Sequence, residues 1–254
     1  MLFNWLQKNI KHVPPYEKLA PIYDFLMRHV DYQMWAEHIL SIYKKLHFSP
    51  ESLLDTSCGT GSFLVNLSGK ITELYGCDGS FPMIRQARMK EKLNRIPLWV
   101  NDMRRFGLKK QVDAIVCLYD SINYLKTSDE ILLALENFYE TVKERGVLIF
   151  DICTIQNSEL NFSNYYEVKK ENGFSYTRRS RFDRKKHIQI TEFQIKFKND
   201  PRLYHEVHRQ RIYPTELFFD LIEKTNWTLK YALDGFSFDA AHQNSNRIHF
   251  VLIK

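Results

Sequence analysis

The sequence predicts an α/β fold, in which a mainly parallel sheet is covered by helices on both faces and carries an inserted antiparallel β meander. Three observations lead to this prediction. Short apolar runs alternate with helical patterns from residue 52 to residue 153, as expected of parallel strands joined by crossover helices. The first apolar run ends in a turn that contains glycine. Residues 165–213 then hold four strand-like runs without a helical pattern between them.

The N-terminal part, residues 1–47, is expected to form a helical cover over this sheet. Apolar side chains recur at intervals of three and four through residues 32–46, directly after Asp31, a residue type that favours the N-cap position. Pro21 interrupts the weaker pattern before it, because proline breaks a helix interior. We therefore expect a broken helix followed by a long one.

Seven strands are expected in the main sheet. Their predicted ranges are 52–57, 73–78, 97–102, 113–120, 147–152, 227–234 and 247–254. A helix at about 61–68 follows the first strand, and Ser80 begins the next helix as its N-cap. Thr127 and Glu130 form a capping box at the start of a third helix, which Gly146 is expected to end.

The meander is expected to interrupt this α/β pattern. Its four strand-like runs are separated by turns near residues 171–173, 183–186 and 199–201. Pro214 then begins a further helix. We therefore assign residues 48–155 and 214–254 to the main α/β domain, and residues 156–213 to an inserted β subdomain.

The charge of the chain is concentrated in one place. The sequence has 36 Lys and Arg against 30 Asp and Glu, a formal net charge of +6, which invites a nucleic-acid interpretation. Residues 169–186 contain eight basic and two acidic residues, and the rest of the chain is balanced at 28 of each. The excess therefore belongs to one hairpin of the meander, either as a solvated edge or as a contact for one particular partner.

The four cysteines form no C-x-x-C pair, and each lies in or beside an apolar run. This pattern is typical of buried thiols in a reducing compartment, so we expect a cytoplasmic protein without disulfides or a metal site. His205 and His208 are no metal pair, because a three-residue step along a strand puts them on opposite faces. The longest apolar run, residues 114–119, is far shorter than the roughly 20 residues of a membrane-spanning helix. The N-terminus, MLFNWLQKNIKHV, lacks the apolar core of a signal peptide.

Residues that could bind a ligand or take part in catalysis lie where the first four strands end. Because open α/β sheets bind ligands at the carboxyl ends of their strands, these residues are expected to share one site. The first strand ends in D-T-S-C-G-T-G (residues 55–61), and the second ends at Asp78, which is placed to accept hydrogen bonds from ribose hydroxyls. The third ends in N-D-M (101–103) and the fourth in L-Y-D-S-I-N (118–123). Leu64 occupies the third glycine position of a dinucleotide fingerprint and the lysine of a phosphate-binding loop is missing, so neither motif is present.

This ordered set resembles that of the class I S-adenosylmethionine-dependent methyltransferases. Their first motif is an acidic residue followed by a short glycine-rich turn, and this chain has D-x-x-C-G-T-G with Ser57 at the first glycine position. The resemblance covers about residues 16–155, and the two C-terminal strands also fit it. It implies a Rossmann-like seven-stranded methyltransferase sheet that binds S-adenosyl-L-methionine.

The resemblance also implies cofactor-binding roles by position. Asp55 would anchor the glycine turn or the ammonium group, Asp78 would hold the ribose hydroxyls, and Asp102 would accept from the adenine amino group. The full implied set is Tyr16, Tyr23, Trp35, Asp55, Gly59, Gly61, Asp78, Gly79, Ser80, Met83, Asn101, Asp102, Met103 and Leu118. Some of these residues have a simpler explanation, since Met83 and Leu118 would be core residues in any fold and the aromatic residues of the cover would be packing residues.

The acceptor side is less defined by the sequence. Methyl transfer from a sulfonium is an in-line displacement, so the protein mainly aligns the reacting atoms, and a base is needed only for a protonated acceptor. Tyr119 and Asp120 are the candidates for positioning or deprotonating the acceptor. Candidate substrate contacts are Tyr124, Arg178, His205 and Arg211. An arginine that faces inward would favour an anionic acceptor.

Three functions stay open on the sequence. The first is a methyltransferase acting on N or O of a small molecule, because the fourth strand lacks the [DN]-P-P-[YF] sequence of enzymes that methylate base amino groups. The meander also resembles the substrate lid of aminosugar and glycine N-methyltransferases. The second is an RNA methyltransferase whose 169–186 hairpin contacts phosphate. The third is a non-catalytic module that binds the cofactor and a protein partner.

Overall fold

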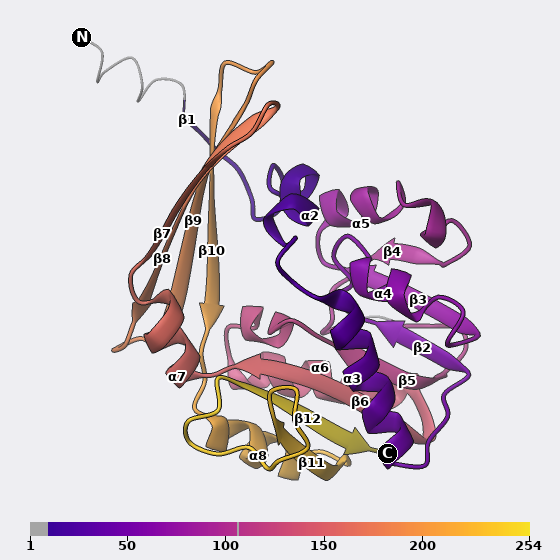
Figure 1. Ribbon diagram of the computed structural model, residues 1–254. Coiled ribbons are helices and arrows are strands. Elements are labelled where there is room, and N and C mark those ends of the chain that lie inside the picture. The colour runs from indigo at the N-terminus through magenta and orange to yellow at the C-terminus, as the bar shows by residue number, and fades with distance from the viewer. Residues whose placement is uncertain (1–9, 106) are drawn as a thin grey trace.

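The computed structural model describes residues 10–105 and 107–254, and over these residues the chain forms a seven-stranded and a five-stranded sheet. Figure 1 shows the seven-stranded sheet surrounded by helices, with the long strands of the other sheet standing beside it. Residues 1–9 of the expected N-terminal cover lie outside the described residues.

The main sheet has the strand order β11-β12-β6-β5-β2-β3-β4. Its strands are β2 (Ser52–Asp55), β3 (Glu73–Asp78), β4 (Leu98–Val100), β5 (Val112–Cys117), β6 (Val142–Cys153), β11 (Thr228–Asp234) and β12 (Arg247–Ile253). Strands β2 to β6 pair in parallel, and β12 runs antiparallel between β6 and β11. The order reverses between β2 and β5, which is the switch point where such sheets bind ligands. The predicted α/β fold class is confirmed.

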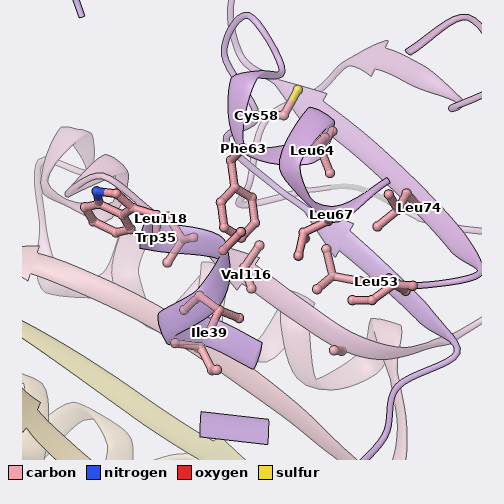
Figure 2. Close-up of a cluster of buried hydrophobic side chains, with 14 of the residues drawn as sticks. Trp35, Ile39, Leu53, Cys58, Phe63, Leu64, Leu67, Leu74, Val116 and Leu118 are labelled. Carbon is pink, nitrogen blue, oxygen red and sulfur yellow. The ribbon is translucent and has the colours of Figure 1, made fainter. Parts of the chain in front are cut away.

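Helices cover both faces of the main sheet, because both faces carry buried apolar side chains. One face packs against α3 (Tyr32–Lys45), α4 (Ser62–Leu67) and α5 (Phe81–Ala87), and the other against α6 (Ser128–Thr141) and α8 (Thr215–Glu223). Figure 2 shows the first cluster, in which Trp35 and Ile39 of α3 lie near Phe63 of α4 and Val116 of β5. The short helical turns η2 (Glu91–Leu93) and η3 (Ser121–Tyr124) follow α5 and β5. In the described part of the chain, every helix is too short or too polar to cross a bilayer.

The N-terminal segment links the two sheets. It begins with β1 (Ile10–His12), continues through η1 (Ala20–Ile22) and α2 (Tyr23–Leu26), and ends in α3. The Asp31 side chain accepts a hydrogen bond from the Met34 amide at 2.9 Å, which confirms the predicted N-cap. Pro21 lies in the first turn of η1, so the first helix is broken as predicted. Strand β1 is not predicted, because three residues carry no periodic pattern.

The five-stranded sheet has the order β1-β10-β9-β8-β7. Its long strands are β7 (Tyr165–Lys170), β8 (Phe174–Asp183), β9 (Ile188–Phe197) and β10 (Leu203–Arg211), which pair antiparallel in sequence order as predicted. The short helix α7 (Ile155–Asn157) and the π-helical turn η4 (Ser158–Phe162) lead into it from β6. Tyr176, Phe193 and Tyr204 of this meander are buried against Leu19 and Leu26 of the N-terminal segment. One face of the meander is therefore covered by the start of the chain.

Gly146 does not end the third helix, contrary to the prediction. Helix α6 ends at Thr141 and β6 starts at Val142, so Gly146 lies inside a strand. A Cβ on Gly146 would lie 2.5 Å from a Val142 methyl and 2.7 Å from the Asp113 carbonyl oxygen. The glycine therefore permits a close backbone approach where the pairing of β5 and β6 shifts register.

Strand β5 ends at Cys117, three residues before the predicted end. Tyr119 and Asp120 have φ angles of 64° and 50°, in the left-handed region that costs energy for residues other than glycine. Two such residues in succession turn the chain out of the sheet at its carboxyl edge. This backbone geometry places both side chains at the switch point.

Candidate functional site

The turn after β2 is fixed at the carboxyl edge of the main sheet. Asp55 Oδ1 accepts a hydrogen bond from the Ser57 amide at 3.0 Å, and the Cys58 amide donates to the Cys77 carbonyl at 2.9 Å. These bonds tie the turn to its own strand and to β3. The backbone around Ser57 therefore has a defined position beside the cavities described below.

The two glycines of this turn have different surroundings. Both have positive φ angles, 54° at Gly59 and 77° at Gly61. A Cβ on Gly61 would lie 2.3 Å from Leu93 Cδ1, so this glycine makes room for packing. A Cβ on Gly59 would meet no atom within 4 Å, because Gly59 faces a cavity. Of the two glycines that the sequence places beside the cofactor, the structure brings Gly59 to the cavity and Gly61 to Leu93.

Asp78 ends β3 with a half-buried side chain. Its Oδ2 accepts from the Gly59 amide at 2.9 Å and its Oδ1 from the Ser80 amide at 2.8 Å. Burial raises the pKa of Asp78 to about 6 and that of Asp55 to about 7, and no Lys or Arg of the described residues offsets either effect. Two carboxylates without a cation suit a ligand that brings positive charge or hydroxyl donors.

A cavity of about 610 Å³, here called the strand-end cavity, opens beside Asp78. Its lining includes Gly59, Asp78, Gly79, Ser80, Met83, Asn101, Asp102 and Met103. Both Asp102 oxygens accept hydrogen bonds from Arg104 Nε, at 2.9 and 3.1 Å, and these bonds lower the pKa of Asp102. A ligand that bonds to Asp102 therefore has to share its carboxylate with Arg104.

The N-terminal segment is fastened over the glycine turn by Asp24. The carboxylate accepts from the Thr60 hydroxyl at 2.5 Å and pairs with Lys90 at 2.8 Å. Beside this contact, Trp35 and Leu118 line a smaller cavity of about 50 Å³, which shares several lining residues with the strand-end cavity. These contacts hold the N-terminal segment against the turn.

A second large cavity, of about 600 Å³, lies between the N-terminal segment and the meander and is here called the meander cavity. Among the described residues, four tyrosines line both large cavities, namely Tyr16, Tyr23, Tyr119 and Tyr124. The hydroxyls of Tyr16 and Tyr124 lie 2.7 Å apart. The two cavities therefore meet at one tyrosine boundary, built by the N-terminal segment and the residues that follow β5.

Arg178, a candidate substrate contact in the sequence, lines the meander cavity. Its guanidinium lies 4.9 Å from the Tyr165 ring centroid and 5.8 Å from that of Phe193. Its Nε is buried without a hydrogen-bond partner among the described residues. A guanidinium held by aromatic rings and lacking an anion is a natural contact for an anionic ligand.

Asp120 and Tyr119, the two candidates for handling the acceptor, both line the meander cavity. Asp120 is already engaged, because Arg247 donates to its Oδ1 at 2.8 Å and Gln210 to its Oδ2 at 2.5 Å. Arg247 also pairs with the fully buried Asp151. Burial raises the pKa of Asp120, and Arg247 counteracts this effect.

His205 and Arg211 do not line either large cavity, although the sequence suggests them as substrate contacts. The His205 ring faces the other side of the meander, where it contacts His12 and Glu192. The cause is the alternation of side chains along β10, which points His208 into the cavity instead. In the sequence, His208 stands out only as half of a rejected metal pair, and no group of described residues could hold a metal ion.

The basic run of residues 169–186 is divided by the same alternation. Lys169 and Arg178 line the meander cavity. Arg181 and Arg184 lie outside it and pair with glutamates at 3.5 and 3.0 Å. The run therefore forms no single continuous basic surface.

Comparison with known proteins identifies the kind of site. Residues 53–146 match the sequence model of a methyltransferase domain. The chain is 27% identical over 242 residues to the putative methyltransferase YqeM of Bacillus subtilis (strain 168), a match that covers 92% of this chain and 95% of the relative. A solved S-adenosylmethionine-dependent methyltransferase from Clostridium acetobutylicum ATCC 824 shares the fold with a TM-score of 0.80 and 24% identity, over 94% of this chain and 98% of that one. Together these matches support a class I S-adenosylmethionine-dependent methyltransferase.

The methyltransferase is also similar to a sugar-modifying relative. It is 32% identical over 134 residues to the dTDP-3-amino-3,4,6-trideoxy-alpha-D-glucopyranose N,N-dimethyltransferase of Streptomyces venezuelae. This match covers 52% of this chain and 56% of the relative. The predicted family, the Rossmann-like fold and the cofactor S-adenosylmethionine are thereby confirmed.

Proposed function

We propose that this methyltransferase moves a methyl group from S-adenosylmethionine to N or O of a small-molecule acceptor that carries an anionic group. The observation that carries the proposal is the meeting of two large cavities at the tyrosine boundary. In-line displacement needs the acceptor and the leaving group on opposite sides of the methyl carbon. Two cavities joined at one boundary satisfy this requirement.

The strand-end cavity is proposed as the cofactor side. Gly59 leaves its backbone open to a ligand, and Asp78 offers a carboxylate to ribose hydroxyls. Asp55, in the adjoining smaller cavity, offers a buried carboxyl group to the ammonium of the methionine part. Asp102, shared with Arg104, is assigned to the adenine end. The other proposed cofactor contacts are Tyr16, Tyr23, Trp35, Gly79, Ser80, Met83, Asn101, Met103 and Leu118. Bound there, S-adenosylmethionine supplies a methyl group on an already activated leaving group.

The meander cavity is proposed as the acceptor side. Arg178 and Arg28 line it, and neither forms an ion pair with a described residue, so an acceptor phosphate or carboxylate would complete their charge. The Streptomyces venezuelae relative is named for a substrate that joins an amine to a dTDP group, which matches this chemistry. Tyr119 and Tyr124, at the boundary, are proposed to align the acceptor, and Asp120 to position it through Arg247.

The proposal assigns a task to each part of the chain. Residues 48–155 and 214–254 bind the cofactor, residues 156–213 act as the acceptor lid, and the described part of residues 1–47, from residue 10 on, covers both. We place the protein in the cytoplasm. This location is supported by its four buried free cysteines, Cys58, Cys77, Cys117 and Cys153.

Two measurements test the function. Isothermal titration with S-adenosylhomocysteine tests the cofactor side. Transfer of tritium-labelled methyl groups tests the acceptor, with dTDP-3-amino-3,4,6-trideoxy-alpha-D-glucopyranose, O-phosphoethanolamine, glycine and total RNA as probes. We expect the cofactor product to bind and the label to reach an amine that carries phosphate.

The outcomes separate the alternatives. Absence of cofactor binding to folded protein would contradict methyl transfer. Label in RNA, with binding that falls steeply as salt rises, would instead favour the RNA methyltransferase. Cofactor binding without transfer to any probe would favour a non-catalytic module.

A further inference from the structure

A buried chain of hydrogen bonds leads from the tyrosine boundary into the meander. The Tyr16 hydroxyl lies 2.7 Å from that of Tyr124, which lies 3.1 Å from Nδ1 of His208. Nε2 of His208 lies 3.3 Å from Oε2 of Glu206. His208 is 4% exposed and Glu206 is 0% exposed, so bulk water does not compete for the hydrogen bond between these two residues. The chain starts at Tyr16, which lines both large cavities.

Glu206 determines the direction of these hydrogen bonds. Its carboxylate accepts three backbone N–H groups of the N-terminal segment, at distances from 2.5 to 2.9 Å, so it acts as an acceptor. Nε2 of His208 therefore donates to it, which leaves Nδ1 to accept from the Tyr124 hydroxyl. Tyr124 in turn accepts from Tyr16. The Tyr16 oxygen is then left with a free lone pair at the boundary.

We propose that Tyr16, Tyr124, His208 and Glu206 form a proton relay for an amine or hydroxyl acceptor, an inference that rests on the proposed function. As the acceptor atom bonds to the methyl carbon, the carbon–sulfur bond breaks and its electron pair stays on sulfur. The acceptor proton passes to the Tyr16 oxygen, the Tyr16 proton to Tyr124, and the Tyr124 proton to His208 Nδ1. Both tyrosines end neutral, and the positive charge rests on His208 beside Glu206.

The surroundings favour this relay over a single basic side chain. Burial raises the pKa of both Tyr16 and Tyr124, so neither holds a negative charge and each has to pass its proton on. Asp120, the base suggested by the sequence, has both oxygens occupied by Arg247 and Gln210. The imidazole of His208 is the acceptor that the tyrosines reach.

The groups that face His208 come from several elements. Besides the two tyrosines of the relay, β9 contributes the Phe193 ring, whose centroid lies 5.4 Å away and which also packs against Arg178 of β8. Among the described residues, Glu206 is the charged group in hydrogen-bond contact with His208. Changing Glu206 therefore changes the charge beside His208 most directly.

The tautomer of His208 tests the relay without any acceptor. Nitrogen-15 NMR of the complex with S-adenosylhomocysteine should show a neutral ring at pH 8, with Nε2 protonated and Nδ1 unprotonated. Tyr124→Phe should shift the Nδ1 signal. His205→Gln, the matched control on the outer face of the same strand, should leave the His208 signals unchanged. A protonated Nδ1 at pH 8 would overturn the relay, because it could not accept a proton from Tyr124.

The pH dependence of single-turnover transfer to the amino-sugar nucleotide probe gives a readout that a structural role would not move. The wild-type rate should fall as the pH falls, because a protonated His208 accepts no proton. Glu206→Gln removes the charge that stabilises the protonated ring, so this acid limb should move to lower pH while the maximum rate falls about tenfold. His208→Gln should leave only the part of the limb that comes from protonation of the probe's own amine, and it should lower the rate ~100-fold. An unchanged acid limb in both variants would overturn the relay.

Cofactor titration separates failure of the relay from failure of the proposed function. His208→Gln should bind S-adenosylhomocysteine like the wild type, because His208 does not line the strand-end cavity. A wild type that binds no cofactor contradicts the proposed function. Normal cofactor binding with the opposite His208 tautomer contradicts the relay alone, whether or not the nucleotide probe is methylated.

Discussion

The two cavities that meet at the tyrosine boundary are built in different ways. The strand-end cavity takes its residues from the ends of neighbouring parallel strands. Its Asp78 has no cation beside it, and neither has Asp55 in the adjoining smaller cavity. The meander cavity gathers side chains from distant parts of the chain, and its Arg178 has no anion among the described residues. Each side therefore lacks the charge that its ligand would bring. This difference predicts a ligand with a positively charged group on the strand-end side and a ligand with an anionic group on the meander side.

Asp78→Ala is expected to have the largest effect, on the strand-end side. It leaves the Gly59 and Ser80 amides unpaired and removes a proposed ribose contact, and a hydrogen bond to a charged group contributes about 1.5–3 kcal/mol. Affinity for S-adenosylhomocysteine should fall at least ~100-fold by isothermal titration. Asp102→Ala should weaken binding about tenfold or less, because Arg104 already occupies that carboxylate. Equal losses in the two variants would contradict the assignment of Asp78 to the ribose.

Gly61→Ala and Gly59→Ala should separate packing from binding within one turn. Both variants carry left-handed strain, but the added methyl of Gly61→Ala would also overlap Leu93, so its free energy of unfolding should fall by about 1–3 kcal/mol more than that of Gly59→Ala in a denaturant titration. Gly59→Ala meets no atom and should cost only the left-handed strain of about 1–2 kcal/mol. It should nevertheless weaken cofactor binding more than Gly61→Ala does. The reverse ranking in the binding titration would show that Gly59 does not face the cofactor.

The strand-end side is the part whose residues can be brought together from local features of the sequence. Asp78 and the turn from Asp55 each follow a strand whose apolar pattern is local, and parallel strands bring their carboxyl ends to one edge. The structural reason for a glycine is harder to predict. Gly61 is required by the close approach of Leu93, and Gly146 by that of the β5 backbone, and both neighbours are distant in sequence. Sequence spacing alone does not contain these contacts.

The meander side is predicted only in outline. Four strands and their turns follow from the sequence, but which face meets the cavity depends on how the N-terminal segment packs against the sheet. Successive side chains along a strand point to opposite faces of the sheet. Arg178 and His208 are on the face that lines the cavity, whereas His205 is on the other face. Glu206 could not be found, because a buried carboxylate that binds backbone amides 187 to 190 positions away has no local signature.

Arg178→Gln tests the anionic ligand on the meander side. Thymidine diphosphate, used as a probe in the presence of S-adenosylhomocysteine, should bind about tenfold more weakly, as expected for one lost charge-assisted contact. Arg179→Gln is the matched control, because Arg179 is the next residue on β8 and lies exposed on the other face. It should bind the probe like the wild type. Equal weakening in both variants would indicate binding by the general charge of the hairpin rather than by the cavity.

Asp55→Asn should have the smallest effect and tests why the strand-end carboxylates have no cation. Burial raises the pKa of Asp55 from 3.8 to about 7, so between these values the folded chain holds a proton that the unfolded chain has released. The free energy of unfolding therefore decreases as the pH rises from about 4 to about 7. Asparagine removes this dependence while its Oδ1 still accepts from the Ser57 amide.

The melting temperature of Asp55→Asn relative to wild type should accordingly rise between pH 4.5 and pH 7.5, at roughly 2–4 °C for each kcal/mol. A difference that is the same at both pH values would exclude burial of the charge as the cause. The same variant should bind S-adenosylhomocysteine less tightly at pH 7.5, because the proposed positively charged methionine part loses its buried partner. If Asp55→Asn makes the free protein more stable but weakens cofactor binding, then the carboxylate of Asp55 serves ligand binding and not the stability of the fold.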